Sequence, residues 1–107
     1  MTARLATAGD LPALAEIWNV SFPGDEAFSQ WFLENVFAPE NALVWEEGGR
    51  AAGMLHLLPM RCQVSGQPVQ AAYIFAVAVK PQHRGLGVAA GLLEEALRLS
   101  RERGAAL

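Results

Sequence analysis

The sequence predicts an α/β fold in which a mixed, mostly antiparallel sheet is flanked by helices on both faces. Three observations predict it. Apolar residues at 11–20 recur at helical spacing, strand-like runs at 42–46 and 51–58 are joined by a glycine turn, and an apolar strand at 72–79 precedes a glycine-rich turn and an amphipathic helix. Such a succession of elements is typical of helices packed on a sheet.

Two helices are expected in the first part of the chain. The first covers 11–20, and Asp10 before it is a candidate N-cap. The second covers 26–37, where the spacing of the aromatic residues predicts that both Trp31 and Phe32 lie in the core.

The strands follow from apolar runs bounded by glycine and proline. A short strand at 3–7 opens the chain, and the hairpin at 42–58 follows the second helix. Pro59 marks a sheet edge or a bulge, because proline cannot donate to a strand ladder. The longest strand covers 67–79, and its apolar end at 72–79 is typical of a strand covered on both faces.

Length and composition fit one small globular domain. The chain has 107 residues, of which 52% are hydrophobic and 18% charged, so intrinsic disorder is excluded. Cys62 is the only cysteine, which excludes an intrachain disulfide and a cysteine-based zinc site, and no other metal is expected. Residues 1–10 lack the apolar run of a signal peptide, and no stretch approaches the ~18 apolar residues of a membrane span. We therefore expect a cytoplasmic protein with no membrane partner.

Charge is divided unevenly between the two parts of the chain. Residues 1–60 carry a net charge of −6, whereas residues 61–107 carry +3. An anionic ligand is therefore expected on the second part. The six basic residues there lack an accompanying aromatic or groove-reading motif, so no nucleic-acid partner is expected.

The glycine-rich turn after the long strand has the properties of an anion site. It leads into a helix that runs to Arg103, and the first amides of a helix have no partners inside it. Gly85 and Gly87 have no Cβ to keep a phosphate from the backbone, and Lys80 and Arg84 add positive charge. The buried face of this helix is expected to comprise Leu86, Ala89, Leu92, Leu93, Ala96 and Leu97.

Two other phosphate-binding motifs fit poorly. A P-loop requires a Gly-Lys pair, which the sequence lacks. A dinucleotide fingerprint can be placed on Gly85, Gly87 and Ala90, but it requires a following strand and an acidic residue about 20 positions on, and the sequence given ends at Leu107.

Residues 76–89 resemble the acetyl-CoA motif of the GNAT N-acetyltransferase superfamily. That motif is Arg or Gln, two residues, Gly, one residue, and Gly or Ala, and it is matched here by Arg84, Gly87 and Ala89. The order of the elements agrees along the whole chain, while the specific similarity lies in residues 76–93. The long hairpin before the motif is further similar to the enhanced-intracellular-survival branch of the superfamily.

The resemblance implies an acyl-CoA-dependent N-acetyltransferase, which moves an acetyl group from acetyl-CoA to a primary amine of a small molecule or peptide. The strand end would run beside the pantetheine, the amides of the turn would wrap the pyrophosphate, and Arg84 would reach phosphate or brace the loop. The acetyl-CoA-binding residues so implied are Val77, Ala78, Val79, Arg84, Gly85, Leu86, Gly87, Val88, Ala89 and Ala90.

The resemblance covers only the N-terminal portion of the family's domain. Residues 105–107 look like the start of its next strand, so 1–107 is expected to be a truncated part of one acetyl-CoA-binding domain, poorly active alone. A strand left unpaired at 72–79 would favour self-association through its edge. The alternative is a non-catalytic CoA-binding or structural module of a larger protein.

No catalytic base or acid is assigned from the sequence. His56 is expected to be a hydrogen-bonded histidine of the sheet, and His83 to contact solvent or cofactor in the turn. Asp25 and Glu26 could attract a cationic amine, although capping of the second helix explains them equally well.

Overall fold

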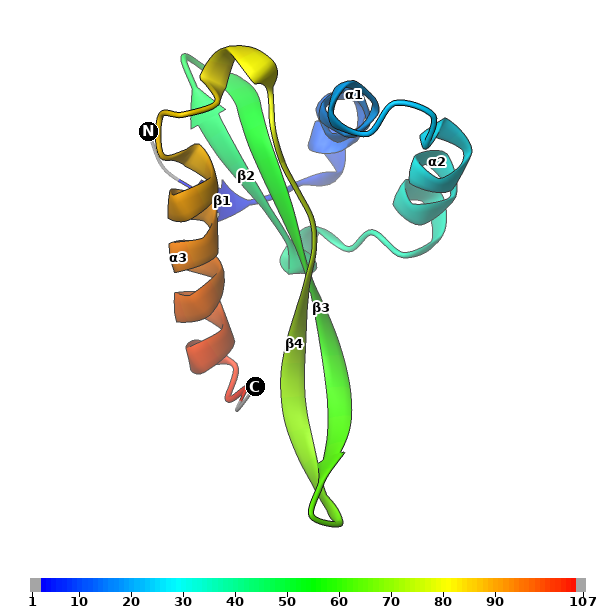
Figure 1. Cartoon of the computed structure of the whole chain (residues 1–107), viewed down its shortest axis with the longest axis vertical. Coiled ribbons are helices and arrows are strands. Elements are labelled where there is room, and N and C mark those ends of the chain that lie inside the picture. Colours follow the sequence, from blue (N-terminus) through cyan, green and yellow to red (C-terminus); the bar gives the residue numbers. More distant parts are fainter. Residues whose placement is uncertain (1–2, 106–107) are drawn as a thin grey trace.

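The computed structural model describes residues 3–105, which form a four-stranded sheet with helices on both faces (Figure 1). Neighbouring strands pair antiparallel in the order β1-β2-β3-β4. The α/β class is thus confirmed, and within the described residues no parallel pair accompanies the antiparallel ones. The elements are β1 (Ala3–Leu5), α1 (Leu11–Ser21), α2 (Glu26–Asn35), β2 (Ala42–Glu47), β3 (Arg50–Val64), β4 (Gln67–Val79) and α3 (Val88–Glu102).

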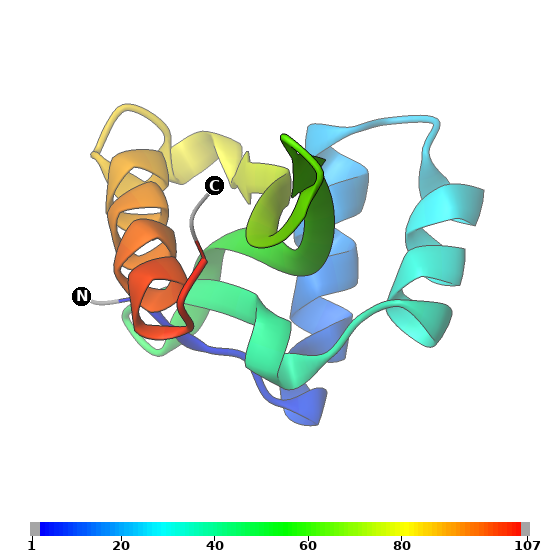
Figure 2. The same ribbon diagram turned by 90° about the horizontal axis from the view of Figure 1, so that it is seen from below.

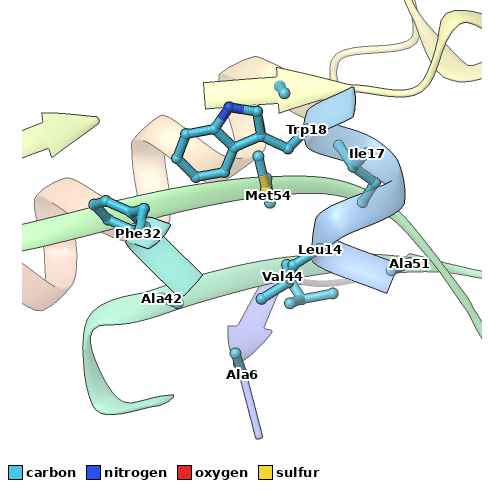
Figure 3. Close-up of a cluster of buried hydrophobic side chains, with 10 residues drawn as sticks. Ala6, Leu14, Ile17, Trp18, Phe32, Ala42, Val44, Ala51 and Met54 are labelled. Carbon is cyan, nitrogen blue, oxygen red and sulfur yellow. The ribbon is translucent and has the colours of Figure 1, made fainter. Parts of the chain in front are cut away.

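Alternation along the two inner strands divides the core between the two faces of the sheet. Val44 and Met54 face α1 and α2, where Trp18 and Phe32 complete one buried cluster (Figure 3). Leu55, one residue along, faces α3 instead. α1 and α2 therefore cover one face and α3 the other, as the view from below also shows (Figure 2).

Two sequence expectations about burial were wrong. Trp31 is 54% exposed, because α2 turns Ser29 and Phe32 toward the sheet instead. On α3 the buried face is Val88, Leu92, Ala96 and Leu99, whereas Leu86, Leu93 and Leu97 are exposed and Ala89 also faces outward. Two apolar stripes lie next to each other on this helix, and spacing alone does not decide which one meets the sheet.

None of the helices between residues 3 and 105 is long and apolar enough to cross a membrane.

Some strand boundaries depart from expectation: β1 ends at Leu5, and β3 continues through Pro59. Pro59 pairs with Ala72 without a bulge, and β2 pairs with β3 only as far as His56, so Pro59 lies at a sheet edge, one of the two alternatives expected. The far end of the β3–β4 hairpin projects beyond the helices (Figure 1). β4 pairs only with β3 among the described residues, so its other side is an open sheet edge. Its side chains nevertheless pack into both clusters, Phe75 and Ala78 toward α1 and α2 and Ile74 and Val79 toward α3, so the run at 72–79 is covered on both faces as expected.

The ends of the first and last helices show how local contacts set their limits. Asp10 precedes α1, but its carboxylate accepts from the Arg4 guanidinium at 2.8 Å and the Thr7 amide at 2.7 Å rather than capping the helix. These contacts lower the pKa of Asp10 to about 2. α3 ends in a Schellman arrangement, in which Gly104 has φ +79° and the Ala105 amide donates to the Ser100 carbonyl at 2.9 Å.

α3 lies unusually close to the sheet at Gly53 of β3. A Cβ placed on Gly53 would lie 2.9 Å from Val88 Cγ1 and 3.2 Å from both the Ala78 carbonyl oxygen and Leu92 Cδ1. Only a residue without a side chain permits this approach. The contact sets the first turn of α3 directly against the end of β4.

We predict that Gly53→Ala lowers the free energy of unfolding by about 1–3 kcal/mol, because the added methyl group overpacks the interface with α3. In a strand with open space at this position, replacing glycine by alanine would instead raise the free energy of unfolding by about 0.5–1 kcal/mol. The sign of the change therefore tests the close contact, and urea unfolding measures this free energy. In a Val88→Ala background, which removes Cγ1, the cost of Gly53→Ala should shrink, and a stabilising effect in the parent chain would refute the contact.

Candidate functional site: the turn between β4 and α3

The turn between β4 and α3 presents open backbone to solvent. It comprises a 3₁₀ segment (Pro81–His83), followed by residues 84–87, and Gly87 occupies the N-cap position of α3. Gly85 and Gly87 have φ of +80° and +81°, and nothing lies within 4 Å of a Cβ built on either. The glycines therefore provide both a left-handed backbone and free space above it.

The amides of this turn have no acceptor in the described part of the chain. No hydrogen bond between residues 3 and 105 takes up the N–H groups of residues 85–90, and the first amide of α3 to find one is that of Gly91, which donates to the Gly87 carbonyl at 2.9 Å. Unpaired amides at the start of a 15-residue helix carry a partial positive charge. The turn can therefore bind an anion through its backbone alone.

Arg84 ties the turn to the end of β4. Its Nε donates to the Val79 carbonyl at 3.0 Å, whereas its two terminal NH₂ groups make no hydrogen bond within the described residues. The side chain therefore braces the loop through the backbone, not through a salt bridge, and still presents positive charge. Lys80 does not contribute to the turn, because its Nζ lies 2.8 Å from Glu16 Oε1 on α1, where it holds the pKa of Glu16 below its ordinary value.

The structure gathers most of the predicted cofactor residues around one hollow of about 250 Å³. Its lining comprises Val79, His83, Arg84, Gly85, Gly87, Val88, Ala89 and Ala90. Three predicted residues lie outside that lining: Leu86 is exposed, Ala78 is buried beneath α1 and α2, and Val77 lies further back on β4. His83, expected in the turn, lines the hollow.

β4 contains a bulge that the sequence did not indicate. Met54 pairs with Ala78 and His56 with Phe75, so one residue of β3 faces two of β4, Ala76 and Val77. Ala76 has φ +54°, a conformation that alanine rarely adopts. The packing around the bulge must therefore hold the backbone in this conformation. No glycine marks the place, so no residue type signals it in the sequence.

The other candidate residues occupy environments that differ from expectation. His56 is 1% exposed among Trp18, Phe32 and Phe37, and its Nε2 has no hydrogen-bond partner in the described residues, so it is not the hydrogen-bonded histidine expected. Asp25 stands at the N-cap of α2, yet its carboxylate accepts from Trp18 Nε1 at 2.9 Å instead of capping the helix.

The chain belongs to the GNAT acetyltransferases: the family described as "Acetyltransferase (GNAT) domain" matches residues 2–107. The turn described above is thus part of an acetyltransferase domain, and the resemblance seen in the sequence is confirmed. No curated protein matches the sequence.

Solved structures agree with this assignment. A GCN5-related N-acetyltransferase from Anabaena variabilis is 28% identical with a TM-score of 0.86, over 95% of this chain and 26% of that one. Eis1 from Mycobacterium abscessus, at 17% identity and a TM-score of 0.85, shares the fold over 98% of this chain and 27% of its own. A predicted acetyltransferase with acetyl-CoA from Clostridium acetobutylicum shares it at 17% identity and a TM-score of 0.73, over 97% of this chain and 75% of that one. The chain thus spans about a quarter of the first two proteins.

We predict that the stability of the fold declines below about pH 6.5 because of His56. Burial lowers the pKa of His56 to about 4, so the folded state resists the proton that the unfolded state accepts. The stabilisation is complete above the unfolded pKa and is lost as pH falls toward 4, by about 2 kcal/mol at pH 5. Chemical unfolding between pH 7.5 and 5 measures it. His56→Phe should flatten the profile in this range, and an unchanged slope would exclude His56 as its source.

Proposed function

We propose that this domain binds acetyl-CoA at the turn between β4 and α3 and transfers the acetyl group to a primary amine. The observation that carries the proposal is the run of unpaired amides at residues 85–90, set on two open glycines at the start of α3. A pyrophosphate supplies the oxygens that such amides lack, and the free NH₂ groups of Arg84 add charge-assisted hydrogen bonds.

The edge of β4 supports the rest of the ligand. Residues 77–79 lead directly into the turn, and β4 pairs only with β3 among the described residues. An extended pantetheine arm with its amide groups can lie along such an edge in the manner of an added strand. The thioester would then lie at the bulge, with the pyrophosphate at the turn.

The proposed reaction is a direct transfer between the two substrates. The ammonium group of the bound substrate first gives one proton to water. The neutral amine nitrogen then attacks the thioester carbonyl, a C–N bond forms and the C–S bond breaks. The nitrogen loses a second proton to water and the departing thiolate of CoA takes up a proton from water, so the products are an N-acetyl amide and free CoA thiol. With the thioester at the bulge, this exchange would take place beside Ala76 and Val77.

We predict that Gly87→Asp abolishes CoA binding, because it places a carboxylate where the pyrophosphate would bind. Gly66→Asp is a matched control, since Gly66 has φ +79°, is equally open and lies in the β3–β4 turn. Calorimetric titration with CoA should show at least a 10-fold weakening for Gly87→Asp only, a change of about 1.4 kcal/mol or more. Equal affinity in both variants, or displacement of CoA by NAD at a similar concentration, would refute the site.

We also propose that copies of this chain associate through the outer edge of β4. The edge is long, and within the described residues no strand covers it. If CoA lies along the same edge, it competes with the association. Light scattering after size exclusion should show a dimer fraction that falls when CoA is added and is unaffected by NAD. A monomer at all concentrations would contradict this proposal without affecting the proposed CoA site.

A further inference from the structure

A second hollow, of about 280 Å³, lies between the end of α1, the α1–α2 turn and the bulge of β4. Its lining comprises Trp18, Phe22, Asp25, Phe75, Ala76 and Val77. Val77 also begins the strand end that we assign to acetyl-CoA. A molecule in this hollow would therefore lie next to the thioester, on the side of the sheet that α1 and α2 cover.

The walls of this hollow are aromatic. The ring centroids of Trp18 and Phe75 are 6.0 Å apart, and those of Trp18 and Phe22 are 6.5 Å apart, both in edge-to-face geometry. Trp18 is fully buried at the base, whereas Phe22 is 39% exposed at the rim. The chemistry of these walls favours an apolar ligand or a cation placed over a ring face.

The aromatic surface continues beyond the hollow across α2 and β4. Phe75 contacts Phe28 with a centroid distance of 6.2 Å, Phe28 contacts Trp31 at 6.0 Å, and Tyr73 stacks on Phe75 at 6.0 Å. Phe28, Trp31 and Tyr73 are between 41% and 54% exposed. We call these three residues the aromatic ladder. It gives a ligand larger than the hollow an apolar surface on which to extend.

Asp25 is the one charged side chain that lines the hollow among the described residues. Trp18 Nε1 donates to its Oδ2 at 2.9 Å, which fixes the carboxylate and leaves its remaining lone pairs free. Between residues 3 and 105 no basic side chain lines the hollow with it, so its charge can be matched by a cationic ligand. The net charge of −6 on residues 1–60 adds to the attraction for a cation.

Together these features define a substrate class. Resting on the function proposed above, we infer that the acceptor is a primary amine attached to an aromatic or apolar body. Its ammonium group binds Asp25 beside the ring of Trp18, and its body lies against Phe22 and Phe75 and continues onto the aromatic ladder. The hollow is near the lower limit of small-ligand sites, so it takes the amine end and one ring. Amines with many hydroxyls fit poorly, because the aromatic walls would leave most of those hydroxyls without partners, and amines with a carboxylate fit poorly because Asp25 repels it.

The test uses 2-phenylethylamine as the probe, with 2-phenylethanol as its uncharged counterpart and glucosamine as a hydrophilic amine. The indole N–H resonance of Trp18 in the ¹H–¹⁵N spectrum, assigned with Trp18→Phe, reports on the hollow because this group donates to Asp25. We expect 2-phenylethylamine to shift this resonance at concentrations at which the other two compounds do not. An equal response to all three compounds would overturn the inference.

Variants separate the contribution of charge from that of shape. Asp25→Asn keeps an acceptor for Trp18 Nε1 but removes the charge, and it should weaken 2-phenylethylamine binding by about 10-fold or more. Phe22→Ala should weaken it by a smaller factor, since Phe22 lies at the exposed rim. Glu34→Gln, an exposed change on α2 outside the hollow, is the matched control and should have no effect. Unchanged binding in Asp25→Asn would overturn the inference.

Thiol release from acetyl-CoA distinguishes this inference from the function on which it rests. Faster release with 2-phenylethylamine than with glucosamine, and loss of that preference in Asp25→Asn, supports both. Release at equal rates with both amines leaves the acetyltransferase function standing and overturns the inferred substrate class. No release with any amine, together with an Asp25-dependent shift of the Trp18 resonance, supports the amine site and contradicts the proposed function of this chain.

Discussion

The close approach of α3 to the sheet at Gly53 is the constraint on which the candidate site depends. A helix is an anion site only where its first amides point at open space, and that place is set by how the helix packs. Val88 and Leu92 rest on Gly53 with no side chain between them and the strand. The start of α3 is thereby placed at the end of β4, and the six free amides lie where an extended ligand on that strand would end.

β4 connects the two halves of the proposed chemistry. Its outer edge and the turn beyond it offer backbone groups, whereas its bulge faces the aromatic hollow beneath α1 and α2. In a regular edge strand, alternate residues would direct their backbone groups to β3 and the others outward. The bulge at Ala76 and Val77 releases part of the backbone at the point where the two proposed ligands would meet. The strained φ of Ala76 is a cost that the surrounding packing must offset.

The uneven charge of the two parts of the chain matches the charges of the groups that the two proposed sites would bind. The basic second part carries the turn with Arg84 and the free amides, which suit an anion. The acidic first part carries Asp25, which suits a cation. Lys80 and Glu16, which pair across the two parts, neutralise each other between the two sites. Each proposed site thus carries a charge opposite to that of the group it would bind, Arg84 at the turn and Asp25 in the hollow.

The sequence by itself determined the order of the elements and the nature of the turn. Helical spacing, glycine positions and the Arg84-Gly87-Ala89 pattern are local properties, and local backbone preferences act on them directly. Only the tertiary structure decided which stripe of α3 is buried, that Trp31 faces outward and that Nε2 of His56 has no hydrogen-bond partner among residues 3–105. It also decided the bulge at Ala76 and the pairing of Asp25 with Trp18. These features arise from contacts between residues far apart in the chain. The spacing of residues along one segment does not specify such contacts, so it cannot predict them.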